Sequence, residues 1–117
     1  MVLLTSGATG RAKRVPLSQR NVCTSARDVC RSIRLSVDDR CLSMWELFHV
    51  GGLVDLLLAP LHSGGVVIAT KGFDATDFFD ALEDARPTWF QGVPTALREL
   101  TVHAERQGTD HRGSSLR

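Results

Sequence analysis

The sequence predicts an α/β fold in which a mostly parallel sheet is flanked by helices, and three observations support this fold class. Short apolar or β-branched runs alternate with amphipathic stretches along the chain. Glycine and proline residues separate these segments. The length of 117 residues, with 43% hydrophobic and 23% charged residues, is typical of one globular domain of moderate size.

The elements are expected in a regular order. A strand at 2–5 and a second strand around 15–17 come first, and Ser18 is the expected N-cap of a helix that runs to about Ile33. Further strands are expected at 41–44, 65–70 and 88–91. The remaining helices are expected at 51–62, from Asp74 or Thr76 to the break at Pro87, and from Pro94 to about Arg106. Leu97, Leu100 and Ala104 form the predicted inward stripe of the last helix.

Composition excludes several classes of function. The net charge of +1 gives no electrostatic case for a nucleic-acid or anionic-membrane partner. Cys23, Cys30 and Cys41 lack metal-site spacing, so we expect no metal site and reduced thiols in a cytoplasmic protein. The N-terminus has no signal-peptide pattern, and the longest apolar run, 50–61, is too short for a membrane span and carries Asp55.

A loop that follows the first strand is the main candidate site. It contains Thr5, Ser6, Gly7, Ala8, Thr9, Gly10 and, after a short gap, Lys13. Glycines allow close backbone approach, hydroxyls donate to phosphate oxygens, and a lysine adds a compact positive charge, so the loop can bind a triphosphate. The glycine spacing does not fit a Walker A motif. Ordinary turn chemistry explains the same residues if the loop has no ligand.

Four more segments accompany this loop in a fixed order: 17–21, 47–53, 60–65 and 92–95. With Thr5–Lys13, they resemble landmarks of the adenylate-forming (AMP-binding) superfamily, whose loop usually reads Thr-Ser-Gly-Thr-Thr-Gly-x-Pro-Lys-Gly-Val. The segment Leu47–Leu53 is similar to the family's Leu-Phe-His-x-x-Gly-Leu. The resemblance covers nearly the whole chain and is closest to the acyl-CoA synthetase branch.

The resemblance implies an activity. A carboxylic acid substrate attacks the α-phosphate of ATP with Mg²⁺ present, and coenzyme A then takes the acyl group from the acyl-adenylate. The phosphate-binding residues become Thr5 to Gly10 and Lys13, and the substrate pocket includes His49, Gly51 and Gly92. No catalytic residue is assigned within this chain. Each of these residues also has an alternative role. Lys13 can be an ordinary exposed loop lysine, His49 a structural histidine, and Gly92 part of a turn.

Three positions depart from the family's loop, and each changes its chemistry. Ala8 removes a hydroxyl donor, Ala12 removes a stiffening proline, and Arg14 adds bulk where glycine is usual. Together they predict a weaker or altered grip on phosphate.

The chain is expected to be an internal slice of the large N-terminal domain of a longer ligase, with a flexible tail at 107–117. The family's Tyr-Gly-x-Thr-Glu and Thr-Gly-Asp segments and its C-terminal lysine have no match here. We therefore expect the 117-residue chain by itself to have no ligase turnover. A non-catalytic nucleotide-binding module and a truncated structural or interaction remnant are the two alternative functions.

Overall fold

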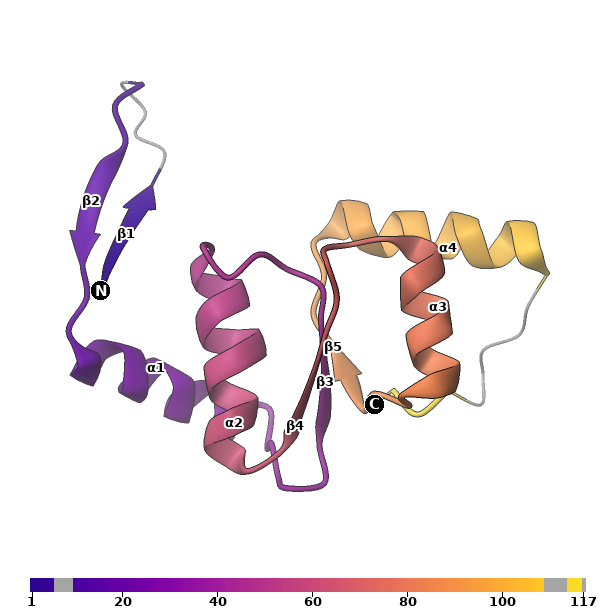
Figure 1. Cartoon of the computed structure of the whole chain (residues 1–117), viewed down its shortest axis with the longest axis horizontal. Coiled ribbons are helices and arrows are strands. Elements are labelled where there is room, and N and C mark those ends of the chain that lie inside the picture. Colours follow the sequence, from indigo (N-terminus) through magenta and orange to yellow (C-terminus); the bar gives the residue numbers. More distant parts are fainter. Residues whose placement is uncertain (6–9, 109–113, 117) are drawn as a thin grey trace.

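The computed structural model describes residues 1–5, 10–108 and 114–116, which form an antiparallel hairpin and a parallel sheet (Figure 1). The hairpin consists of β1 (Val2–Thr5) and β2 (Lys13–Pro16). The parallel sheet has the order β4-β3-β5 and is built from β3 (Arg40–Ser43), β4 (Val66–Ala69) and β5 (Trp89–Phe90). The predicted α/β fold with a mostly parallel sheet is therefore confirmed.

Helices cover both faces of the parallel sheet (Figure 1). One face carries α1 (Gln19–Ser32), the π-helix η1 (Gly51–Leu58) and its continuation α2 (Ala59–Ser63). The other face carries α3 (Ala75–Asp84) and α4 (Pro94–Gln107). None of the described helices is long and apolar enough to cross a bilayer.

Side-chain caps fix where two of these helices begin. The Ser18 hydroxyl accepts a hydrogen bond from the Asn21 amide at 3.1 Å, which satisfies one free N–H of the first turn of α1. Asp74 accepts from the amides of Thr76 and Asp77 at 2.8 and 3.1 Å. These backbone donors hold the pKa of the Asp74 carboxyl below its ordinary value. Both caps were predicted from the sequence, Asp74 as one of two candidates.

Strand β3 separates two apolar cores because its side chains alternate between the faces of the sheet. Leu42 packs with Phe78, Leu82 and Leu100 from α3 and α4. Cys41 faces the other way, against Leu56 of η1 and Trp89 of β5. Both β3 residues are fully buried, and burial raises the pKa of the Cys41 thiol to about 12.

Two details of the helices differ from the sequence-based expectation. Leu97 does not face the core, because α4 buries Ala96 and Leu100 instead and leaves Leu97 49% exposed. The segment predicted as one helix at 51–62 begins as a π-helix before it becomes α-helical at Ala59. Uniformly apolar runs carry no clear periodicity, so the sequence does not reveal this change of helix type.

The end of the described chain returns to the parallel sheet. Ser115 donates a hydrogen bond from its hydroxyl to the Pro87 carbonyl at 2.6 Å. Leu116 packs against the core formed with α3 and α4. Of the tail predicted at 107–117, Gln107 is the last residue of α4, Ser115 and Leu116 contact the fold, and 109–113 and 117 lie outside the described residues.

Candidate functional site

The described ends of the predicted phosphate loop, Thr5 and Gly10 to Lys13, lie at the end of the hairpin that is remote from α1, and the hairpin projects from the helical layers (Figure 1). Thr5 and Lys13 face each other as the last paired residues of β1 and β2, and both are exposed. Gly10 has a φ of +75°, a conformation that favours glycine. Ser6, Gly7, Ala8 and Thr9 lie outside the described residues, so their assignment to phosphate binding stays a prediction.

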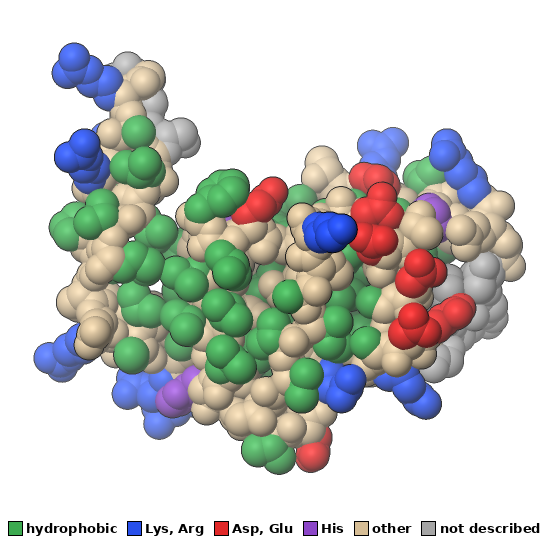
Figure 2. Space-filling model, in the orientation of Figure 1, with side chains coloured by type: hydrophobic (Ala, Val, Ile, Leu, Met, Phe, Trp, Pro, Cys, Tyr) green, Lys and Arg blue, Asp and Glu red, His purple; other side chains and the backbone are tan. Residues whose placement is uncertain are grey.

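The charge on this hairpin suits a polyanion. Residues 1–17 include Arg11, Lys13 and Arg14 and contain no Asp or Glu. Figure 2 shows Lys and Arg side chains over the projecting hairpin. Cations at an exposed glycine-containing loop attract a triphosphate and also compensate its charge once it is bound.

The carboxyl ends of the parallel strands form a second candidate region, because ligands of open α/β sheets bind beyond this edge. The chain leaves β3 into a turn that contains Trp45 and His49, and it leaves β5 into Gln91 and Gly92. These two exits lie next to each other because β5 pairs directly with β3. Each exit contributes to a different pocket.

His49 lies at the smaller of these two pockets. The pocket has a volume of about 430 Å³ and is lined by Met44, Trp45, Glu46, His49, Phe73 and Val93. The His49 ring lies against Phe48, with centroids 4.5 Å apart, and 6.3 Å from the centroid of Trp45. His49 itself is exposed, so its ring borders the pocket entrance and is not a buried core residue.

Gly92 lies at the larger pocket, which we call the edge groove. It has a volume of about 880 Å³ and runs between α1, η1 and α4 beside β5. Its walls are mainly apolar and its polar groups are few, as in most small-molecule sites. The residues that line it are Ser25, Asp28, Val29, Ser32, Ile33, Val50, Val54, Asp55, Trp89, Phe90, Gln91, Gly92 and Leu97.

Glycine at positions 51 and 92 makes room for aromatic neighbours. A Cβ at Gly92 would lie 2.8 Å from Cε1 of Phe90, so a larger residue would displace the Phe90 ring. A Cβ at Gly51 would lie 3.3 Å from Cζ3 of Trp45 and 3.7 Å from Oδ2 of Asp55. Gly51 is not among the lining residues of either pocket, but it lies beside Trp45, which lines the His49 pocket, and Asp55, which lines the edge groove.

The sequence-based site did not include Asp55 or Gln91. In the structure, Nε2 of Gln91 donates to Oδ2 of Asp55 at 3.5 Å, and both residues line the edge groove. One signal for Asp55 was present, because it is the charged residue in the otherwise apolar run 50–61. Gln91 offered no signal, since its partner is 36 residues away in the sequence.

Metal ligands are not gathered in the described part of the chain. Among residues 1–5, 10–108 and 114–116, no group of three or more His, Cys, Asp or Glu is placed to hold a metal ion. Most of the Asp and Glu side chains that are visible in Figure 2 lie over α3 and its surroundings, on the opposite side of the molecule from the hairpin.

These observations describe an α/β domain that has pockets at the carboxyl edge of a parallel sheet and cationic residues, Arg11, Lys13 and Arg14, in its N-terminal hairpin. A family model described as AMP-binding enzyme matches residues 1–117. The chain belongs to this AMP-binding enzyme family.

Two relatives illustrate the similarity in sequence. Indoleacetate–CoA ligase of Aromatoleum aromaticum is 38% identical over 117 residues, which is 100% of this chain and 22% of that protein. Sulfoacetate–CoA ligase of Cupriavidus necator is 37% identical over 100 residues, which is 86% of this chain and 20% of the relative. The chain thus spans about a fifth of the length of the relatives it matches.

Solved structures show the same arrangement of elements. O-succinylbenzoate coenzyme A synthetase (MenE) of Bacillus subtilis, in complex with ATP and magnesium ion, matches with a TM-score of 0.84 at 27% identity. That match covers 99% of this chain and 23% of MenE. ATP-bound MatB of Rhodopseudomonas palustris matches with a TM-score of 0.78 at 31% identity, over 85% of this chain and 19% of MatB.

Proposed function

We propose that this chain supplies the phosphate loop and the acyl pocket of an ATP-dependent CoA ligase that activates a carboxylic acid. The observation that carries the proposal is the match of the AMP-binding family model to residues 1–117. The relatives named as CoA ligases, and the ATP-bound structures that the chain resembles, support it. We also propose that the protein is cytoplasmic, as expected from its sequence.

The hairpin fits the role of holding the phosphates. Backbone amides and hydroxyls of Thr5 to Gly10 are assigned to the phosphate oxygens, and Lys13 is assigned to neutralise their charge. Arg11 and Arg14 add to the positive field at this end of the hairpin. When bound, ATP supplies the α-phosphate that the substrate carboxylate attacks, Mg²⁺ shares the phosphate charge, and coenzyme A supplies the thiol that accepts the acyl group.

The carboxyl edge of the parallel sheet fits the role of holding the acid. His49 borders its pocket, and Gly51 and Gly92 keep space beside Trp45 and Phe90. The apolar walls of the edge groove exclude water from the body of the substrate. We assign the edge groove to the body of the acid, and His49, which is exposed and lines the neighbouring pocket, to the path by which the acid enters.

A lysine-to-alanine pair tests the phosphate role. We expect Lys13→Ala to weaken ATP binding to the chain by about tenfold, the size of one hydrogen bond to a charged group. Lys71→Ala is the matched control, since Lys71 is the second lysine of the sequence, is also exposed and lies outside the hairpin. Isothermal titration with ATP and Mg²⁺ measures both. Equal affinities for the two variants would contradict the assignment of Lys13.

A further inference from the structure

One polar pair stands out in the mainly apolar edge groove. Asp55 comes from the middle of η1, and Gln91 follows the carboxyl end of β5. Their side chains meet with Nε2 of Gln91 at 3.5 Å from Oδ2 of Asp55. Both residues are half-buried, so the pair is accessible from the groove that it lines. Polar groups of this kind commonly fix the orientation of a ligand in an apolar site.

The contact leaves Asp55 able to accept another hydrogen bond. A donor–acceptor distance of 3.5 Å is at the long limit for a hydrogen bond, so the Gln91 amide holds the carboxylate weakly. An ionised carboxylate has two oxygens and about four lone-pair sites. A ligand donor placed in the groove can therefore bind Asp55 without breaking a strong internal contact.

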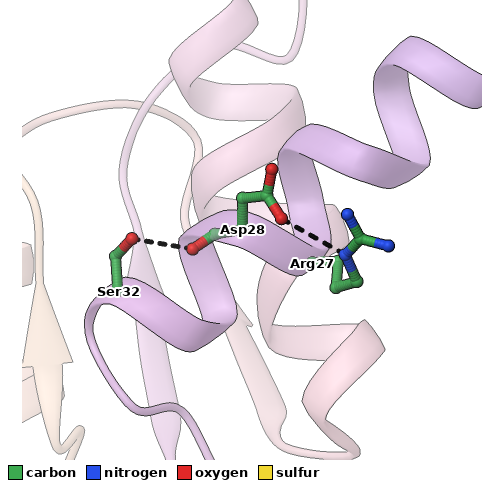
Figure 3. Close-up of polar contacts among 3 residues, drawn as sticks. All are labelled: Arg27, Asp28 and Ser32. Atoms are coloured by element: carbon green, nitrogen blue, oxygen red, sulfur yellow. Dashed lines mark hydrogen bonds and ion pairs between the residues drawn. The ribbon is translucent and has the colours of Figure 1, made fainter.

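The charge of the groove favours donors over anions. Its lining includes the carboxylates of Asp28 and Asp55, and none of the described residues that line it is Lys or Arg. Asp28 lies at the rim on α1, where Nε of Arg27 lies 3.2 Å from its Oδ1 (Figure 3). Its backbone carbonyl accepts from the Ser32 hydroxyl at 2.8 Å. Asp28 is thus partly compensated, whereas the donor that the structure gives Asp55 is a neutral amide.

We propose that Asp55, whose carboxylate the Gln91 amide contacts only weakly, is a specificity-determining residue that selects carboxylic acids whose remote end carries a hydroxyl or amino donor. This inference rests on the proposed function, because it treats the edge groove as the acyl site. The remote end enters the groove, since a carboxylate beside Asp55 and Asp28 is repelled. The substrate class is a monocarboxylic acid with an apolar, preferably aromatic, body, and dicarboxylic acids are disfavoured.

A matched ligand series tests this selectivity on the 117-residue chain. The probes are 3-phenylpropanoate and its para-hydroxy, para-aminomethyl and para-carboxy derivatives, which differ only at the remote end. Titration of the ¹⁵N-labelled chain, followed by shifts of the Gly92 amide and the Trp89 indole signals, gives each affinity and locates the ligand. We expect the two donor-bearing acids to bind about tenfold more tightly than 3-phenylpropanoate, and the para-carboxy acid most weakly.

Two variants assign the effect to the pair. Asp55→Asn removes the charge and is expected to reduce the preference for donors to within about twofold. Gln91→Leu removes the internal donor and is expected to keep or increase that preference, because Asp55 is then left with more acceptor capacity. Asp80→Asn, on the exposed face of α3, is the control that removes one charge away from the groove and should leave the ranking unchanged.

The outcomes separate this inference from the proposed function. An unchanged ranking in Asp55→Asn, equal binding of all four acids, or no shift at Gly92 and Trp89 would each overturn the role of Asp55. The para-hydroxy probe is also offered as its neutral amide. If acid and amide bind equally while the donor preference persists, the role of Asp55 stands and the carboxylate-activating function is contradicted instead.

Discussion

The strands of the hairpin and those of the parallel sheet differ in how far their side chains are exposed to solvent. In the hairpin, Val2 and Leu4 are 59% and 68% exposed. In the parallel sheet, Cys41 and Leu42 are 0% exposed, because helices cover both faces. A two-stranded hairpin by itself is at best marginally stable in water. The comparison teaches that the fold is stabilised at β3, whereas the proposed phosphate loop is carried by an element that contributes little to that stability.

Truncating a leucine in each region provides the strongest test of this comparison. Leu42→Ala is expected to lower the free energy of unfolding by about 2–5 kcal/mol, because it leaves a cavity in the core beside Phe78 and Leu100. Leu4→Ala is expected to change it by less than about 0.5 kcal/mol, as for most exposed positions. Urea unfolding followed by far-UV circular dichroism measures both. Similar losses would show that the hairpin is part of the stabilising core.

A polar network at the start of the parallel sheet provides the second test. Asp39 is 4% exposed and accepts from the Thr88 hydroxyl at 2.8 Å and from the Ser36 amide at 2.7 Å. The Thr88 oxygen in turn accepts from the Arg40 amide at 3.0 Å. This network joins the residue before β3 to the residue before β5, so it fixes how these two strands enter the sheet.

Thr88→Val removes the centre of that network with little change of shape. It is expected to cost about 1–3 kcal/mol, because it leaves the Arg40 amide and one oxygen of Asp39 without this partner. Thr101→Val is the control, since the exposed Thr101 hydroxyl donates only to a carbonyl of its own helix, that of Leu97 at 3.0 Å. Thermal and urea unfolding compare the two variants. A loss that is no larger for Thr88→Val would indicate that the network is not a stabilising tie.

The contrast between the two regions also explains what the sequence could reveal. Local signals predicted the order of the elements and the helix caps at Ser18 and Asp74. The exposed position of Leu97 was not predicted, because helical spacing identifies a stripe but not which neighbour covers it. The π-helix was missed because the run Gly51–Leu58 is almost uniformly apolar.

The candidate site also contains residues that the sequence could reveal and residues that it could not. His49, Gly51 and Gly92 were named from local motifs. The structure places His49 and Gly92 at the two pockets beyond β3 and β5, and Gly51 beside a lining residue of each. Their roles as substrate-pocket residues stay predictions. Asp55 and Gln91 come together only through the pairing of β5 with β3 and the packing of η1 on β3. A pair created by tertiary structure leaves no pattern in a single sequence.

Trp89 belongs to the short edge strand β5 of the parallel sheet and is 8% exposed, so it is slightly less buried than Cys41 and Leu42 of the central strand β3. Its indole Nε1 is buried and has no acceptor among the described residues. An unpaired buried donor costs free energy, and replacing tryptophan by phenylalanine removes that cost while it also removes packed volume. We therefore expect Trp89→Phe to stay within about 1 kcal/mol of the parent chain, whereas Trp89→Ala should lose about 3–5 kcal/mol. Urea unfolding of the two variants measures the difference. A large loss in Trp89→Phe would mean that the indole N–H is paired in solution, and β5 would then be held by more than the apolar contacts seen here.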